Sequence, residues 1–317
     1  MLQFLKDNNI EYKQNVSISQ LTGMYQGGTI PFVVYPSTYG QIVLLYRYVN
    51  DNHLRFDILG SITNTYIAST YLCDVVIKTT KYNDFSIHND TAFASCGCLL
   101  TKVAQQLSSL GCKGYEGLVG IPGTIGAAAI NNSGAFDSSM DKVVRAVTVI
   151  NANGLISKLS NEQLKYKTRH SILKGSTNSC MVLTIELDIS RRGDVASIQK
   201  SIQRNMCYRK VVIDGKRKSL GSCFVSSSLK HLHDRHKIMF FIKRIVSGLI
   251  KSFYSSQALN TYLDFLFLGH PELHKHCDSL NRFAWDKRTK EHDFFYYIDT
   301  MQSLADNKLE LEIEIRS

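Results

Sequence analysis

The glycine-rich stretch YEGLVGIPGTIGAAAINNSGAFD, from Tyr115 to Asp137, decides the fold. It combines small residues with almost no charge, in a chain whose formal net charge is +10. Glycine lacks a Cβ, so its backbone reaches positive φ and its N–H groups can line a concavity that holds phosphate oxygens. The stretch therefore predicts a bound nucleotide. A helix of small residues packed tightly under a sheet is the alternative.

The spacing of the glycines separates this stretch from the dinucleotide site of a doubly wound fold. That site places GxGxxG directly after the first strand, with an acidic residue about 20 positions later. The chain contains no such triplet. Instead, Pro122 and Gly123 follow Ile121, and Gly126 opens a run of alanines. A different nucleotide fold is expected.

Residues 117–137 resemble the flavin-binding segment of the UDP-N-acetylenolpyruvoylglucosamine reductases, also called UDP-N-acetylmuramate dehydrogenases. The pattern of that family is close to GLEGLxGIPGTxGGAxxxNxGAYG. The resemblance implies that this segment binds FAD. The residues it implies as FAD contacts here are Gly117, Ile121, Pro122, Gly123, Thr124, Gly126, Ala127, Asn132, Gly134 and Ala135.

A second segment, ILGSITNTYI from Ile58 to Ile67, resembles the family loop LGxGSNxLx. The resemblance implies further FAD contacts by Gly60, Ser61, Thr63 and Asn64. Ile62 stands where the family usually has glycine, so we expect this turn to be shaped a little differently. A hairpin turn rich in turn-forming residues is the alternative.

Hydrophobic periodicity indicates an α+β chain in which short β-branched runs alternate with helical patterns. The expected strands are 30–35, 58–62, 75–79, 143–150, 155–159, 181–189 and 309–316, and the first expected helices are 39–52 and 99–110. The turn NANG (151–154) predicts a hairpin between the fourth and fifth strands.

The family resemblance extends this to a two-part FAD-binding domain of the PCMH/vanillyl-alcohol-oxidase type with a smaller α+β substrate domain. At 317 residues the chain is long enough for several sub-domains. We expect FAD-binding subdomains at 1–79 and 80–199, and a substrate-binding domain at 200–317.

Three residues are candidates for catalysis. Reduction of an enol ether double bond needs a hydride on one carbon, a proton on the other, and stabilisation of the charge that develops beside the carboxylate. RHSILK resembles the family motif YRxSxFK, which implies that Arg169 stabilises the enolate-like intermediate. GSCFVSS resembles GSxFKNP, which implies that Ser222 is the proton donor. LEIEIRS resembles LEPEVRxI, which implies that Glu314 helps to polarise the substrate.

Alternatives remain for two of these residues. Ser222 can be an ordinary turn serine, and as an acid it needs a neighbouring cation, which the basic run 216–218 could supply. Val225 and Ser226 replace the lysine and asparagine that usually follow. Glu314 shares one face of its expected strand with Glu310 and Glu312, and only the family match separates them.

The positive charge is concentrated in residues 200–251, which hold thirteen Lys or Arg against two acids. Such a segment attracts phosphates of a nucleotide sugar, a pyridine dinucleotide or a nucleic acid, or an anionic membrane. Within it, residues 236–253 (HKIMFFIKRIVSGLIKSF) have helical spacing. The pattern favours a core helix with a basic outer face, and a helix lying on a membrane surface is the alternative.

Cysteines and histidines give no convincing metal site. The eight cysteines include no CxxC pair, so they indicate buried thiols in a reducing compartment. His270, His274, His276 and Asp278 offer ligands within nine residues, but no second cluster accompanies them. We expect no metal.

The resemblance implies a flavoprotein oxidoreductase that uses FAD and NADPH to reduce UDP-N-acetylglucosamine enolpyruvate to UDP-N-acetylmuramate, a step of peptidoglycan synthesis and cell wall biogenesis. The expected partner is a nucleotide sugar and not a nucleic acid. With no signal peptide and no long apolar run, the expected location is the cytoplasm. The C-terminal third diverges from the family, so two alternatives stay open: a related FAD oxidoreductase acting on another nucleotide-linked sugar, and a non-catalytic nucleotide-binding homologue.

Overall fold

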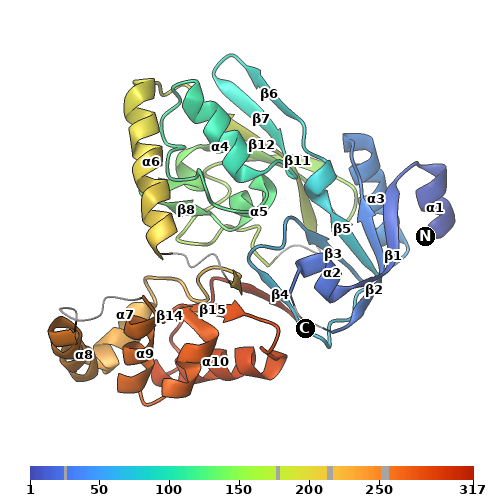
Figure 1. The fold of residues 1–317 in the computed structure, drawn as a ribbon. Helices are drawn as coiled ribbons and strands as arrows, with labels where there is room; N and C mark the ends of the chain where they lie inside the picture. The colour runs from blue at the N-terminus through green and yellow to red at the C-terminus, as the bar shows by residue number, and fades with distance from the viewer. Residues whose placement is uncertain (25–26, 176–178, 213–216, 251–256) are drawn as a thin grey trace. The chain divides into compact units, whose positions relative to one another are not determined.

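The computed structural model describes residues 1–24, 27–175, 179–212, 217–250 and 257–317. They form two compact units, each with its own hydrophobic core (Figure 1). The first unit comprises Met1–Ser17, Thr29–Ile62 and Leu72–Arg209, and the second comprises Ile18–Gly28, Thr63–Tyr71 and Lys210–Ser317. The three domains expected from the sequence, at 1–79, 80–199 and 200–317, stay a prediction.

The first unit begins with a four-stranded sheet in the order β1-β2-β5-β3. Its strands are β1 (Glu11–Ser17), β2 (Thr29–Tyr35), β3 (Phe56–Leu59) and β5 (Val75–Lys78). Strand β5 pairs in parallel with β2 and β3, and all four of its side chains are buried. A parallel strand covered on both faces reads as a continuous apolar run, as VVIK nearly does.

Two helices belong to this part of the first unit, α1 (Leu2–Asp7) and α3 (Tyr39–Asp51). Helix α3 begins after Thr38, whose hydroxyl accepts a hydrogen bond from the Gln41 N–H at 3.2 Å and so caps the helix. Its buried residues recur at helical spacing on one face: Ile42, Leu45, Tyr46 and Val49. The predicted helix 39–52 is therefore confirmed.

The second sheet of the first unit is antiparallel, in the order β11-β10-β12-β7-β6. Its strands are β6 (Phe85–His88), β7 (Thr91–Ser95), β10 (Val144–Asn151), β11 (Ile156–Ser160) and β12 (Cys180–Asp188). Strands β10 and β11 form the hairpin predicted from NANG, and the Gly154 N–H donates to the Asn151 carbonyl at 2.8 Å to close the turn.

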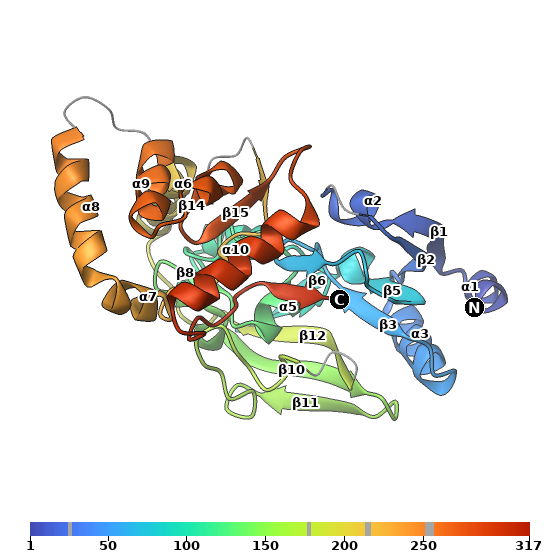
Figure 2. The ribbon, with the colours of Figure 1, turned by 90° about the horizontal axis from the view of Figure 1, so that it is seen from below.

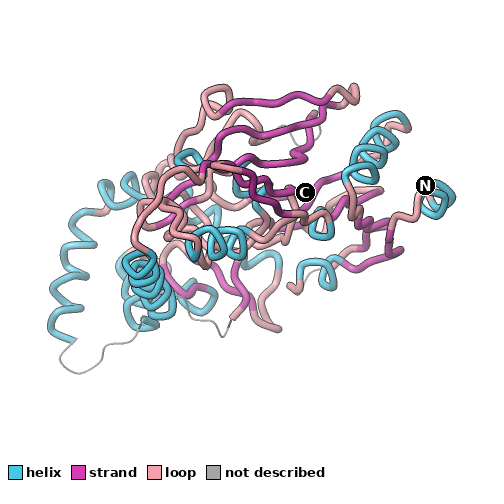
Figure 3. Tube along the Cα trace, turned by 90° about the horizontal axis from the view of Figure 1, so that it is seen from above, coloured by secondary structure: helices cyan, strands magenta, loops and turns pink. Residues whose placement is uncertain are grey.

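Three helices accompany this sheet, and Figure 3 traces them as cyan tubes beside the magenta strands. They are α4 (Leu100–Ser109), α5 (Ile125–Ile130) and α6 (Val195–Val212), the last of which runs past the end of the first unit. Helix α5 packs against β12 and β7. The smaller elements are β8 (Gly134–Ala135), β9 (Ser138–Ser139) and the 3-10 turns η1 (Thr79–Lys81) and η2 (Met140–Lys142).

The second unit joins short strands and helices around an aromatic core. Its strands are β4 (Thr65–Ile67), β13 (Lys218–Ser219), β14 (Cys277–Ser279), β15 (Arg282–Trp285) and β16 (Glu314–Arg316). Its helices are α2 (Ile18–Thr22), α7 (Leu229–Arg235), α8 (Lys237–Ile250), α9 (Gln257–Phe267), η3 (Pro271–His276) and α10 (Glu291–Leu304). The buried rings of Tyr66, Phe283, Trp285, Phe294 and Tyr297 contact one another in this core.

The expected strand 309–316 is wrong over its first part. Only β16 pairs as a strand, in parallel with β4. The residues before it lie against the Cys223–Val225 segment, because the Glu312 N–H donates to the Cys223 carbonyl at 2.9 Å and the Val225 N–H donates to the Glu310 carbonyl at 2.8 Å. The two halves of this alternating pattern therefore form backbone hydrogen bonds with two different segments. The expected strand 58–62 likewise ends at Leu59, where the turn begins.

The expectation for residues 236–253 as a core helix with a basic outer face is also wrong. Helix α8 forms, but its apolar residues face outward: Ile238, Phe241 and Leu249 are each more than 60% exposed. Residues 251–253 lie outside the described part of the chain. Over the described ranges, no helix is both long and apolar enough to cross a membrane.

Candidate functional site

The two segments predicted to bind FAD meet inside the first unit. Gly60 of the second segment lies directly against Thr124 of the first. Together they line a cavity of about 50 Å³. Its lining is Ile58, Gly60, Thr79, Cys96, Thr124, Gly126, Ala127, Ile130, Cys180, Met181 and Val182, a set without a charged side chain. The lining suits an uncharged group.

Two glycines let the backbone approach closely at this cavity. A Cβ built on Gly60 would lie 2.3 Å from the Thr124 hydroxyl oxygen, and one built on Gly126 would lie 2.7 Å from the Cys96 Cβ. The Gly126 N–H donates to the Cys96 carbonyl at 2.9 Å, which fixes this approach. A side chain at Gly60 would push this turn away from Thr124, and one at Gly126 would push the glycine-rich segment away from Cys96.

The other residues of the glycine-rich segment carry the chain around the cavity. The Leu100 N–H donates to the Gly123 carbonyl at 3.0 Å, and Ile121 and Pro122 precede that contact. Gly117 lies at the other end of the segment, where its N–H donates to the Ser138 hydroxyl at 3.0 Å and a Cβ would lie 1.9 Å from the Ala135 carbonyl oxygen. These residues therefore hold the shape of the segment, and none of them lines the cavity itself.

Lys78 is a residue of this site that the sequence reasoning missed. Its side chain is 8% exposed, and its Nζ donates to the Gly60 carbonyl at 2.5 Å. Burial lowers the pKa of Lys78 to about 8, because the charged form loses its hydration. The available signal was a lone cation ending the run VVIK, in which every other residue is apolar.

The turn after Gly60 has a strained backbone at Ile62, and the expectation that its shape differs from that of the family stays a prediction. The φ of Ile62 is 58°, in the left-handed region that glycine enters without strain. The turn thus adopts a glycine-like conformation at a β-branched residue, which costs on the order of 1–3 kcal/mol. The Ile62 side chain is 7% exposed, so its burial offsets part of this cost.

The remaining residues of this turn divide between the units. Ser61 is half-buried in the first unit, whereas Thr63 and Asn64 belong to the second. The Asn64 side-chain amide donates to the Glu312 carbonyl at 2.9 Å, and the backbone carbonyl of Asn64 accepts from the Glu314 N–H at 2.9 Å. Asn64 therefore fastens the end of the turn to the C-terminal segment of the second unit.

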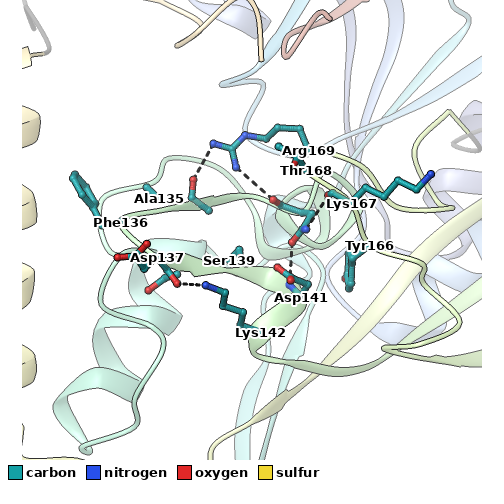
Figure 4. A pocket seen from close by; sticks show the side chains of 13 residues that line it. Ala135, Phe136, Asp137, Ser139, Asp141, Lys142, Tyr166, Lys167, Thr168 and Arg169 are labelled. Carbon is teal, nitrogen blue, oxygen red and sulfur yellow. Dashed lines mark hydrogen bonds between the residues drawn. The ribbon is translucent and has the colours of Figure 1, made fainter. Parts of the chain in front are cut away.

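Arg169 lines a second pocket of the first unit, of about 300 Å³ (Figure 4). Its guanidinium donates to the Gly134 carbonyl at 2.9 Å and to the Asn132 carbonyl at 3.5 Å. The structure thus brings the predicted catalytic arginine to the predicted FAD-binding segment. The pocket is lined by Asn132, Gly134–Ser139, Asp141, Lys142 and Tyr166–Arg169.

Strained backbone is concentrated around this pocket. Arg169, Asn132, Phe136 and Asp137 all have positive φ, between 43° and 67°. Non-glycine residues enter this region at a cost, and they persist there when the surroundings impose the conformation. Such clusters are typical of functional sites, which agrees with the role proposed below for Arg169.

Asn132 ties the flavin segment to the loop that carries Arg169. Its side chain is 7% exposed, its amide donates to the Lys167 carbonyl at 2.9 Å, and its side-chain oxygen accepts from the Asp141 N–H at 2.9 Å. A buried amide with both groups bonded fixes three pieces of backbone at once. The position of Arg169 is therefore set by the same residues that shape the cofactor segment.

Ser222 lies in the second unit, half-buried and next to a segment with buried side chains. Cys223 beside it is 1% exposed, and burial raises the pKa of its thiol to about 11, so the thiol stays protonated near neutrality. Of the basic run expected to assist Ser222, Arg217 pairs with Asp278 and Lys218 donates to the Gly23 carbonyl. The third residue, Lys216, lies outside the described part of the chain.

Glu314 lies in β16 of the second unit, and its carboxylate pairs with Arg316 at 2.8 Å. Its side chain is 22% exposed. Glu310, which shares the expected face, is exposed, while Glu312 is half-buried like Glu314. Burial thus separates Glu314 from Glu310, and the choice between Glu312 and Glu314 still rests on the family motif.

The residues of the first unit fit FAD. The uncharged cavity beside Gly60 and Gly126, and the close backbone approach that both glycines allow, suit a flat ring held between backbone segments. The candidates for holding it are Gly60, Thr124, Gly126 and Ala127, with Lys78 behind the Gly60 carbonyl.

Comparison with known proteins first shows the class of protein to which this chain belongs. Residues 30–160 match the model of an FAD binding domain, and this part of the chain is an FAD-binding domain. The fold agrees: the structure of UDP-N-acetylenolpyruvylglucosamine reductase from Thermus caldophilus aligns with a TM-score of 0.66 and 19% identity, covering 97% of this chain and 99% of that one. The predicted α+β fold, with an FAD-binding domain and a smaller domain, is confirmed.

The family follows from the sequence relatives. The UDP-N-acetylenolpyruvoylglucosamine reductase of Clostridium tetani is 30% identical over 226 residues, 71% of either chain. That of Caldicellulosiruptor saccharolyticus is 29% identical over 205 residues, 65% of this chain and 66% of its own length. The chain belongs to the UDP-N-acetylenolpyruvoylglucosamine reductase family. It matches just under two thirds of the C. saccharolyticus relative and 63% of the one from Caldicellulosiruptor bescii.

Proposed function

We propose that the protein is an FAD-dependent reductase that takes hydride from NADPH and reduces UDP-N-acetylglucosamine enolpyruvate to UDP-N-acetylmuramate. The observation that carries the proposal is Arg169, held on the Asn132 and Gly134 carbonyls at the edge of the flavin segment. Family membership and the FAD-binding domain support the cofactor and the reaction class. We also propose that the enzyme acts in the cytoplasm, in the synthesis of peptidoglycan precursors.

Arg169 stabilises the negative charge that develops beside the substrate carboxylate. When bound, FAD supplies the hydride that reaches one carbon of the enol ether. The electron pair of the double bond then becomes enolate-like, and a fixed cation lowers the energy of that state. Because two backbone carbonyls hold the guanidinium, little reorganisation is needed when the charge forms.

Ser222 completes the reduction by giving its hydroxyl proton to the second carbon, and solvent returns a proton to the serine oxygen. A serine hydroxyl is a weak acid, so this step needs a relay or a nearby cation. Glu314 assists by polarising the substrate carboxyl end, as the family motif implies. One hydride and one proton are added, which balances the conversion of the enolpyruvyl group to the lactyl ether.

A second candidate is the same chemistry on another nucleotide-linked sugar. Val225 stands where the family motif has lysine, and it is only 2% exposed. A buried valine offers a bound substrate neither charge nor a hydrogen-bond donor. The substrate contact usually made from this position must come from elsewhere, or the substrate differs.

The test is turnover with defined substrates. NADPH oxidation is followed with UDP-N-acetylglucosamine enolpyruvate and, separately, with enolpyruvyl ethers of other nucleotide sugars. Substrate-dependent oxidation with the first compound supports the leading proposal. Turnover with another nucleotide sugar alone supports the second candidate. A flavin that NADPH reduces, but that no enolpyruvyl sugar reoxidises, contradicts both.

A further inference from the structure

Helix α8 of the second unit carries an apolar stripe on its outer face. The stripe consists of Ile238, Met239, Phe241, Ile242, Ile245 and Leu249. Their exposed fractions run from 39% for Ile242 to 72% for Ile238. The spacings of three, four and seven residues place them on one side of the helix. A surface helix normally turns such a stripe inward, so this arrangement is inverted.

The opposite face of α8 explains why the helix does not rotate to hide the stripe. Phe240 packs against the second core, with its ring 4.2 Å from that of His233. Lys243 forms an ion pair with Asp264 of α9 at 2.8 Å, and both side chains are at most 20% exposed. Turning the helix over would expose Phe240 and break this pair. The stripe therefore faces outward because Phe240 and Lys243 hold the opposite face of α8 against the rest of the second unit.

Positive charge lies along one margin of the stripe. Helices α7 and α8 together hold five Lys or Arg residues against one acid, Asp234. Lys237 and Arg244 are both exposed, and they lie four residues before and three residues after Phe241, along one margin of the stripe. Long basic side chains beside an apolar strip can cover it partly while their charges point to an anionic layer.

The length of α8 allows it to lie on a membrane surface but is too short for it to cross a bilayer. Fourteen residues make a helix about 21 Å long, which is shorter than the hydrocarbon core of a bilayer. Figures 1 and 2 show α8 at the margin of the second unit, with α7 at one end and α9 alongside. The openness of the stripe rests on the exposed fractions of its six residues, each at least 39%. A second copy of the chain would bring the same cations face to face, which disfavours self-association.

We propose that α8 lies in the surface of a membrane that contains anionic lipids, with the apolar stripe toward the acyl chains and Lys237 and Arg244 at the headgroups. Amphipathic helices with Phe, Leu and Ile on one face and basic residues beside it bind in this way. The attraction to anionic lipid adds to the burial of the stripe. None of the stripe residues lines the FAD cavity, so the inference does not depend on the reaction that the enzyme performs.

The experiment is flotation of the full-length, FAD-loaded protein with vesicles. Vesicles of phosphatidylcholine alone are compared with equimolar phosphatidylcholine and phosphatidylglycerol. The protein should float with the anionic vesicles and stay below the zwitterionic ones, and about 0.5 M salt should weaken the binding. The double variant Phe241→Asp/Ile245→Asp should lose at least about tenfold in binding, because two apolar side chains that would enter the acyl layer are replaced by anions.

The matched control is Leu155→Asp, which changes an equally exposed leucine, 65% exposed, in the β10–β11 turn of the first unit. It should float like the unchanged protein, and flavin absorbance should be equal in all variants. Three results would overturn the proposal. These are no flotation with anionic vesicles, equal flotation of the double variant, or a dimer in light scattering that the double variant converts to a monomer.

Discussion

Replacing Lys78 by methionine should make the stability of the protein respond to pH in the opposite way from most lysine substitutions. The folded state holds Lys78 buried against the Gly60 carbonyl, and burial lowers its pKa from the usual 10.5 to about 8. Below that pKa the folded protein keeps a charged, poorly hydrated ammonium. Methionine has a similar length and no charge, so it fills the site without this penalty.

The size of the effect follows from the two pKa values. Between about 8 and 10.5 the unfolded chain binds a proton that the folded chain has lost, so the stability of the unchanged protein rises with pH across this window. The full penalty at lower pH is about 3 kcal/mol. The variant leaves the Gly60 carbonyl without its donor, which costs about 1–2 kcal/mol. Near pH 7 the variant should therefore be more stable by about 1–2 kcal/mol.

The assay is urea unfolding of FAD-free protein at a series of pH values. FAD is removed because its binding would add to the apparent free energy of unfolding. From about pH 7 to about pH 9.5, the stability advantage of Lys78→Met should shrink by about 2 kcal/mol. Other groups titrate in both proteins and cancel in the difference. Lys200→Met is the matched control, because Lys200 is exposed and its removal relieves no buried charge.

A difference between Lys78→Met and the unchanged protein that stays constant over this pH range would refute the reasoning. It would mean that Lys78 is not held as a buried ammonium behind the cavity. A difference that grows with pH would also contradict it, since the folded pKa would then lie above that of the unfolded chain.

The remaining predictions concern the two proposed catalytic residues and the cavity. Arg169→Met should lower kcat by about 10²- to 10³-fold while flavin absorbance is retained, because a fixed charge at the developing enolate is removed. Lys165→Met is the control, because Lys165 is an exposed residue of the same loop that does not line the pocket, and equal losses in both variants would contradict the role of Arg169. Ser222→Ala should leave the reduction of flavin by NADPH intact and stop its reoxidation by substrate in stopped-flow traces, and two surviving half-reactions would exclude Ser222 as the acid. Gly126→Ala should cost about 1–3 kcal/mol of stability and weaken FAD binding in a titration, since its Cβ would lie 2.7 Å from that of Cys96; unchanged FAD affinity would argue against close packing at the cavity.

Much of the first unit could be predicted because local patterns and tertiary structure agree there. The helical spacing of Ile42, Leu45, Tyr46 and Val49 matches the face that α3 buries, and NANG closes the hairpin between β10 and β11. The contact between Gly60 and Thr124 joins two segments far apart in the chain. No periodicity encodes such a contact, and it was reached only through the resemblance of both segments to one family.

The second unit shows where such reasoning fails. The alternation from Leu309 to Arg316 has the period of a strand, but the backbone of its first half bonds to the Cys223–Val225 segment. The stripe of α8 has the period of a core helix, but Phe240 and Lys243 anchor the other side. Periodicity reports which residues share a face and not which partner covers that face. Lys78 was missed because a single cation at the end of a strand resembles an ordinary strand terminus.

The central claim is that FAD is held in the first unit between the Gly60 turn and the glycine-rich segment. The most direct measurement is a crystal structure of the protein grown with excess FAD, together with the flavin content of the same preparation. The account predicts one FAD per chain, with its ring system against Gly60, Thr124 and Gly126. Protein that takes up no flavin, or flavin bound away from these residues, would contradict it.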